Sequence, residues 1–280
     1  MNLTSFWRDP LAILRSEGYL RLQLSETMKK SVDATFDAGY AFFRQPVEMK
    51  IQQTTDQDLG YRAFGDEYSI SPEFPDQLES FSVSPRLPIA IDQFQSVRER
   101  VLYDRMSQTF DLFEPIVEGL TITLAQQLTG GRIGGHLKGK LRYWSRLQLN
   151  YTRPSSVDFP FINETHEDLD LLTINCASGA GLELRMATDS FLPVNTGALD
   201  AIVFPGEIAW LLSGGELKPM FHRVRTHRDI NERVSLLFFA DPEPQSCEPW
   251  VSTNINHNVD IGAHVRQNVF KFGLKGFREE

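Results

Sequence analysis

The chain has 280 residues and a formal net charge of −9, and this acidic balance argues against a surface for nucleic acid or for an anionic membrane. Its two cysteines, Cys176 and Cys247, are too few for a disulfide framework and fit a reducing cytoplasm. The most apolar segment, residues 198–212, is interrupted by Asp200 and Glu207, and the N-terminus has no apolar signal core. We therefore expect a cytoplasmic protein that does not cross a membrane.

Helical spacing dominates the first half of the chain. After Ser25, which is suited to cap a helix, apolar residues recur every three or four positions up to Pro46. A longer stripe of the same spacing runs from Leu102 to Leu124, with Pro115 as an expected kink or break. We expect both stripes to face the core of the protein.

From residue 141 onward, a period of two and frequent turn residues predict short strands arranged as a jelly roll or a similar double sheet. The chain should therefore form a single domain over residues 1–280, mainly β with flanking helices. We expect a mostly helical N-terminal region over residues 1–135 and a jelly-roll core over residues 136–280.

The first strand of this core alternates polar and apolar side chains. The polar face carries Arg146, Gln148, Asn150 and Thr152, and the other face carries Leu147, Leu149 and Tyr151. A polar row on a strand is commonly exposed to solvent, so the alternation alone leaves open whether this row faces water or a site.

A pair of metal-binding residue types stands in the segment HEDLDLLTI. His166 and Asp168 lie two residues apart, so on a strand both would point to one face, and His222 could complete the site from another strand. Two histidines and one carboxylate leave one face of an octahedral ion open, which suits non-haem Fe(II) and O₂. A histidine and an aspartate on a strand surface are the alternative. His227 and Asp229 repeat the pattern in a turn-like stretch that is less suited to hold ligand geometry.

These motifs resemble, in order and spacing, the isopenicillin N synthase-like family of Fe(II)- and 2-oxoglutarate-dependent dioxygenases. The resemblance rests on HEDLDLLTI, GLELR, VFPGEIAWLLSGGELKPMFHRVR and ERVSLLFFADP, with EGYLRLQ, FFRQPVEMK and DLGYRAFGDE upstream and IGAHVRQNVF downstream. It extends over nearly the whole chain. Two segments depart from the family: MNLTSFWRDP replaces the opening strand usual in plant members, and NYTRP replaces an Asn-Tyr-Tyr-Pro type of sequence.

The resemblance implies a double-stranded β-helix, or jelly roll, that holds Fe(II) through His166, Asp168 and His222 and uses O₂. It also implies that Arg233 and Ser235 grip the far carboxylate of 2-oxoglutarate. A guanidinium suits this task because it offers a planar fork of donors and keeps its charge.

The resemblance further implies that the polar face of the first core strand is directed toward the active site. Asn150 then falls where the family contacts 2-oxoglutarate, and Arg146 and Gln148 become candidates for holding substrate. In the family, the segment equivalent to residues 55–85 leans over the mouth of the active site. Its candidate substrate contacts, for which an exposed loop without such a role is the alternative, are Tyr61, Arg62 and Phe64.

The expected activity is oxidation of a small-molecule metabolite in natural-product metabolism, by hydroxylation, desaturation or ring closure. One alternative is an oxidase of the isopenicillin N synthase type, in which Arg233 and Ser235 would hold the carboxylate of the substrate and 2-oxoglutarate would not be used. The other is a non-catalytic jelly roll with a structural ion, although structural zinc sites usually have four protein ligands and this set has three.

Overall fold

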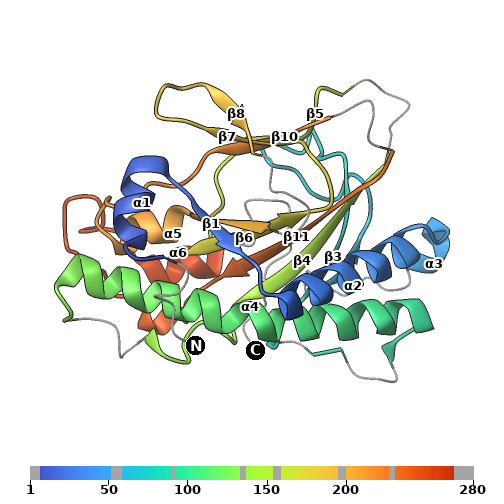
Figure 1. The fold of residues 1–280 in the computed structure, drawn as a ribbon, viewed down its shortest axis with the longest axis horizontal. Helices are drawn as coiled ribbons and strands as arrows, with labels where there is room; N and C mark the ends of the chain where they lie inside the picture. The colour runs from blue at the N-terminus through green and yellow to red at the C-terminus, as the bar shows by residue number, and fades with distance from the viewer. Residues whose placement is uncertain are drawn as a thin grey trace.

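Two antiparallel β-sheets face each other in the computed structural model, and helices cover the outer face of the larger sheet (Figure 1). The structure describes residues 7–51, 59–86, 88–89, 93–132, 137–153, 159–194, 200–226 and 231–267. No helix within these ranges is long and apolar enough to cross a membrane.

Among the described residues, the larger sheet has seven strands and the smaller sheet has four. In spatial order the larger sheet consists of β1 (Leu20–Gln23), β9 (Asp200–Pro205), β6 (Leu172–Ala177), β11 (Arg233–Ala240), β4 (Arg146–Thr152), β3 (Glu79–Val83) and β2 (Gly60–Arg62). The smaller sheet consists of β5 (Phe161–His166), β10 (His222–Arg225), β7 (Leu182–Arg185) and β8 (Phe191–Pro193). From β4 onward the chain passes repeatedly between the sheets, which confirms the predicted jelly-roll core with its helical additions.

The helices are α1 (Pro10–Glu17), α2 (Glu26–Phe43), α3 (Val47–Ile51), α4 (Val97–Thr129), α5 (Glu207–Leu212) and α6 (Ile261–Gln267), with a 3₁₀ turn over Pro244–Ser246. The predicted cap of α2 is confirmed, because the hydroxyl of Ser25 accepts a hydrogen bond from the backbone N–H of Met28. Ser96 caps α4 in the same way, and α4 ends at Gly130 in a left-handed conformation (φ 61°).

Pro115 lies inside α4, and the helix continues through it, so the expectation of a break is wrong. A proline inside a helix costs about 3 kcal/mol. Each large apolar side chain removed from water contributes about 1.5–3 kcal/mol. Because Phe113, Ile116 and Val117 on either side of Pro115 are all buried, packing outweighs the loss of one hydrogen bond.

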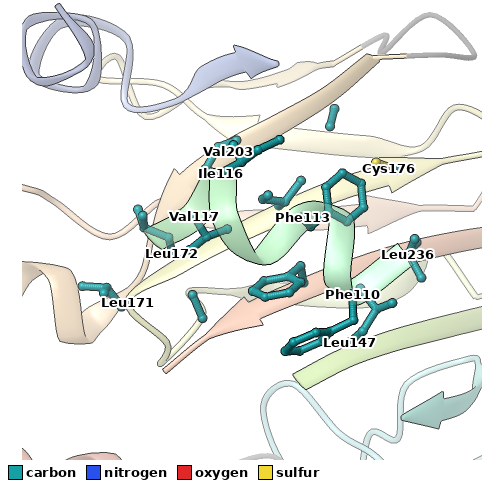
Figure 2. Close-up of a cluster of buried hydrophobic side chains, with 14 of the residues drawn as sticks. Phe110, Phe113, Ile116, Val117, Leu147, Leu171, Leu172, Cys176, Val203 and Leu236 are labelled. Carbon is teal, nitrogen blue, oxygen red and sulfur yellow. The ribbon is translucent and has the colours of Figure 1, made fainter. Parts of the chain in front are cut away.

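The main hydrophobic core lies between α4 and the outer face of the larger sheet. Figure 2 shows Phe110, Phe113 and Val117 of α4 among side chains of four strands. The strand residues labelled there include Leu147, Leu172, Cys176, Val203 and Leu236. The ring centroid of Phe238 on β11 lies 4.8 Å from that of Phe110. This packing buries the outer face of the larger sheet against α4. The inner face of the larger sheet is directed toward the smaller sheet.

The N-terminal region is mostly helical, as predicted, but it also contributes three strands to the larger sheet. β1 pairs with β9, and β3 pairs with β4 on one side and β2 on the other. The helical N-terminal region and the jelly-roll core therefore share one sheet. Through β2 and β3, the segment that was expected to lean over the site is joined to the edge of the larger sheet.

Candidate metal centre and cosubstrate pocket

A cavity lies between the inner faces of the two sheets and has a volume of about 640 Å³, including the part open to solvent. Most of the residues that line it are polar or charged, although the cavity lies inside the protein. The lining residues are Glu67, Ser69, Asp76, Arg146, Gln148, Asn150, Asn163, His166, Asp168, Asp170, Asn175, His222, Val224, Ser235, Leu237 and Phe239.

Three possible metal ligands converge in this cavity. One ligand atom each from His166, Asp168 and His222 lies within 4.8 Å of the others. The Nε2 atoms of His166 and His222 are 3.8 Å and 3.7 Å from Oδ1 of Asp168. The two histidines face each other because their positions are directly paired across β5 and β10. The three atoms therefore form a compact triangle that fits one face of an octahedral ion.

Hydrogen bonds direct each of the three ligand atoms toward this triangle. Nδ1 of His166 lies 2.7 Å from the carbonyl oxygen of Glu164, and Nδ1 of His222 lies 3.0 Å from that of Met220. Each Nδ1 therefore donates to a carbonyl, which leaves Nε2 as the lone-pair atom. Thr173 donates to Oδ2 of Asp168 over 2.5 Å, so Oδ1 remains for the ion.

The His-x-Asp segment is not one continuous strand, which corrects the sequence analysis. β5 ends at His166, Asp168 lies in the connection between the sheets, and β6 begins at Leu172. This connection is held by α5, because the backbone N–H of Glu207 donates to the carbonyl of Asp168. A Cβ atom on Gly206 would come within 2.6 Å of the Asp168 carbonyl oxygen, which explains the glycine before α5.

Burial determines the protonation state of one histidine. Burial, followed by the charge of the neighbouring His166, lowers the pKa of His222 from 6.5 to about 4. His222 is therefore neutral at physiological pH, as a metal ligand must be.

Arg233 is a buried cation without an acidic partner in the described part of the chain. Its Nε donates to the carbonyl of Ala180 and its Nη1 to the hydroxyl of Ser235, each over 3.1 Å, but Nη2 is buried without a partner. Burial lowers its pKa to about 10. An unpaired buried charge is costly, so the part of the cavity beside Ser235, which lines it and binds Arg233, is suited to receive an anion.

Asn150 and Arg146 mark two different ends of the cavity. Asn150 is directly paired with Ser235 across β4 and β11, whereas Arg146 is paired with Phe239, four residues further along β11. The Arg146 guanidinium lies 4.4 Å above the Phe239 ring. It is 3.8 Å from Asp170 and 4.0 Å from Asp241, and its Nε has no hydrogen-bond partner.

The remaining sequence-predicted contacts are distributed differently. Gln148 lines the cavity, while Arg62 lies behind it, where it donates to Glu67 and Gln148. Tyr61 points to the opposite face of the sheet and donates to Glu79, because side chains alternate along β2. Phe64 is 46% exposed and does not line the cavity. Tyr61 and Phe64, which were predicted to contact substrate, therefore do not line the cavity between the sheets.

Sequence reasoning missed several polar residues of the wall. Glu67, Ser69 and Asp76 come from the expected segment 55–85, but they lie in the irregular connection between β2 and β3, which has no periodicity that could single them out. Phe239 could have been found, because it continues the period-two series of Arg233 and Ser235 along β11. The second His-x-Asp pair, at His227 and Asp229, lies outside the described residues.

Comparison with known proteins supports this arrangement. Residues 143–242 match the family model of the 2OG-Fe(II) oxygenase superfamily. A search of curated proteins finds no match to the chain.

Solved structures with the same fold cover most of the chain. A full-length protein of Neurospora crassa in complex with α-ketoglutarate and thymine has 18% identity and a TM-score of 0.76, and the match covers 93% of this chain and 90% of the Neurospora protein. A protein of Caulobacter crescentus assigned to the 2OG-Fe(II) oxygenases has 21% identity, a TM-score of 0.72 and coverages of 91% and 88%. The auxin-oxidising dioxygenase AtDAO1 of Arabidopsis thaliana has 18% identity, a TM-score of 0.63 and coverages of 86% and 90%.

Fold, family match and triad define an iron-dependent oxygenase, because the matched segment contains His166, Asp168 and His222. The matched segment, the triad and the fold together support an Fe(II)- and 2-oxoglutarate-dependent dioxygenase, an oxidoreductase that uses O₂.

Proposed function

We propose that His166, Asp168 and His222 bind Fe(II), that Arg233, Ser235 and Asn150 bind 2-oxoglutarate, and that the enzyme belongs to the isopenicillin N synthase-like branch. The observation that carries this proposal is the buried, unpaired Nη2 of Arg233, on the strand that lines the cavity beside the triad. A carboxylate there would receive charge-assisted hydrogen bonds and remove the cost of the buried cation.

Bound Fe(II) would couple the conversion of 2-oxoglutarate and O₂ into succinate and CO₂ to the oxidation of a substrate C–H bond. Apolar residues around the triad would exclude water from the reaction. Val224 and Leu237 are 7% exposed each and form apolar parts of the cavity wall. The polar wall then orients the cosubstrate at one end and the substrate at the other.

We propose a polar small molecule as the substrate, oxidised by hydroxylation, desaturation or ring closure in natural-product metabolism. Arg146 would hold it, since its guanidinium makes no hydrogen bond to the described residues, whereas Arg62 is already engaged by Glu67. Asp170 and Asp241 beside Arg146 favour a substrate group that accepts hydrogen bonds without carrying a full negative charge. The thymine complex of the Neurospora crassa protein, which has a related fold, is consistent with a substrate of this kind.

An oxidase of the isopenicillin N synthase type is the second candidate. The same unpaired guanidinium would serve there, because Arg233 and Ser235 could hold a carboxylate of the substrate itself.

One experiment distinguishes the two candidates. Fe(II) and 2-oxoglutarate, mixed with the protein without oxygen, should give the visible charge-transfer band of a 2-oxo acid chelated to ferrous iron. Admitting O₂ should then release succinate slowly, and faster with substrate present. An iron-loaded protein with neither band nor succinate would support the oxidase instead.

A further inference from the structure

Gln148 lies in the middle of the cavity wall, yet its side chain is fully occupied by protein partners. Its Oε1 accepts from Nη2 of Arg62 over 2.7 Å and from the hydroxyl of Ser82 over 3.2 Å. Its Nε2 donates to Glu67 over 3.1 Å and to Oδ1 of Asn150 over 2.8 Å. An amide has two donor hydrogens and two acceptor lone pairs, so nothing is left for a substrate. Gln148, which was predicted to contact substrate, is therefore expected to have a different role.

The direction of these hydrogen bonds follows from chemistry. A guanidinium can only donate, so the Gln148 atom that faces Arg62 must be oxygen. The NH₂ group of Gln148 then faces Glu67 and Asn150. Glu67 can accept because it is ionised: burial opposes ionisation, but the charge of Arg62 and hydrogen bonds from Ser80, Arg62 and Gln148 lower its pKa. Arg62, which lies behind the wall, and Glu67, which is part of it, thus determine the orientation of the Gln148 amide.

The orientation of Gln148 determines that of Asn150. Because Gln148 presents an NH₂ group, the Asn150 atom that faces it must be the oxygen, Oδ1. The Nδ2 of Asn150 has no hydrogen-bond partner among the described residues, and Asn150 lines the cavity. It stands directly opposite Ser235, whose oxygen already accepts from Arg233 and whose hydrogen therefore remains available.

We propose that Gln148 is a positioning residue, which relays the polarity of the buried Arg62–Glu67 pair to Asn150 so that Asn150 presents a donor to the carboxylate of 2-oxoglutarate. This inference rests on the proposed function of the cavity. Arg62 and Glu67 act without touching the cosubstrate, since they set which atom of each amide points in which direction.

The test is the affinity of the iron-loaded protein for 2-oxoglutarate, titrated without oxygen through the charge-transfer band. Asn150→Asp replaces the donor by an acceptor and should weaken binding about tenfold or more. Gln148→Glu places an acceptor beside Asn150, which should rotate to donate to it and turn Oδ1 toward the cosubstrate. We expect a loss of about tenfold as well. The neutral Gln148→Leu leaves Asn150 free to rotate and should cost about threefold.

A double-mutant cycle separates the relay from a general effect of charge or folding. In an Asn150→Ala background, Gln148→Glu should have no further effect on 2-oxoglutarate affinity, because no amide remains to be turned. Gln45→Glu is the matched control: Gln45 is also buried, donates to a carbonyl of α2 and lies outside the cavity wall, so affinity should be unchanged.

The relay is overturned if Gln148→Glu and Gln148→Leu bind 2-oxoglutarate like the wild type, or if Gln148→Glu weakens binding equally in the Asn150→Ala background. Failure of the proposed function itself would look different. In that case the wild-type protein with iron would show no band at any concentration of 2-oxoglutarate.

Discussion

The two faces of the larger sheet are both buried, yet they carry opposite chemistry. On β4, Leu147 and Leu149 point toward α2 and α4, whereas Arg146 and Gln148 point toward the smaller sheet. Along β11, Phe238 packs against Phe110 of α4 on the outer face. All these side chains are at most 8% exposed. The exposed fraction of a side chain therefore does not distinguish the hydrophobic core from the functional site. The two are distinguished by the groups that each side chain contacts.

The difference shows where stability and function reside. The outer face gains free energy from apolar area removed from water. The inner face must satisfy each polar group with another, as Arg62, Glu67 and Gln148 do, or leave it for a ligand, as at Nη2 of Arg233. Changes on the outer face should therefore lower stability, and changes on the inner face should lower binding and turnover.

The largest expected effect on the inner face is the loss of a metal ligand. His222→Ala should abolish turnover and most Fe(II) binding, because two remaining ligands hold a labile ion poorly. Iron content and succinate formation are the measurements. His264→Ala is the control, since His264 pairs with Glu207 and does not line the cavity. His227→Ala should likewise keep its iron. Loss of iron in either control would break the assignment of the triad.

Two neighbouring residues of β11 test the comparison directly. Phe238→Ala on the outer face should lower the free energy of unfolding by about 3–5 kcal/mol, because it empties a packed core site. Leu237→Ala on the inner face should cost about 2 kcal/mol, since its side chain borders open space, and should reduce turnover more than Phe238→Ala does. Urea unfolding and succinate assays of both variants give the two quantities. Equal stability losses would contradict the division between the faces.

The cosubstrate end is tested by Arg233→Gln, which keeps hydrogen-bonding capacity but removes the charge. We expect 2-oxoglutarate binding to weaken by about 2–5 kcal/mol while Fe(II) binding survives. Titration of the charge-transfer band measures the change. Arg223→Gln is a matched control on β10, because Arg223 pairs with Glu183 away from the cavity. An unchanged affinity in Arg233→Gln would instead favour the oxidase.

The last prediction concerns the effect of pH on the stability of the metal-free protein. The pKa of His222 is about 4 in the folded state and 6.5 as its ordinary value, so between these pH values the unfolded state binds more protons. Stability should therefore fall as the pH decreases from 6.5 toward 4, by up to about 3 kcal/mol from this group. Urea unfolding of chelator-treated protein at pH 7.5 and pH 5 should show a smaller decrease for His222→Gln. Parallel decreases would show that His222 is not buried as a neutral group.

Local sequence determined most of the elements. The stripes around Phe36 and Phe113 and the caps at Ser25 and Ser96 depend on spacing and on hydrogen bonds within a few residues. The alternation along β4 is also local. The spacing of His166 and Asp168 left a strand surface open as an alternative, and the resemblance to a known family added His222 as the third ligand; the structure brings the three residues together.

Tertiary structure alone decided which buried face became the site. Spacing cannot distinguish Tyr61 from Arg62, yet pairing of β2 with β3 turns one toward Glu79 and the other toward Gln148. The crossing of the chain between sheets at Asp168, and the contact of Gly206 with that crossing, also join segments far apart in sequence. Such contacts depend on the register of strands that are distant in sequence. The alternation of polar and apolar residues along a strand shows that its two faces differ, but it does not show which face packs against the helices.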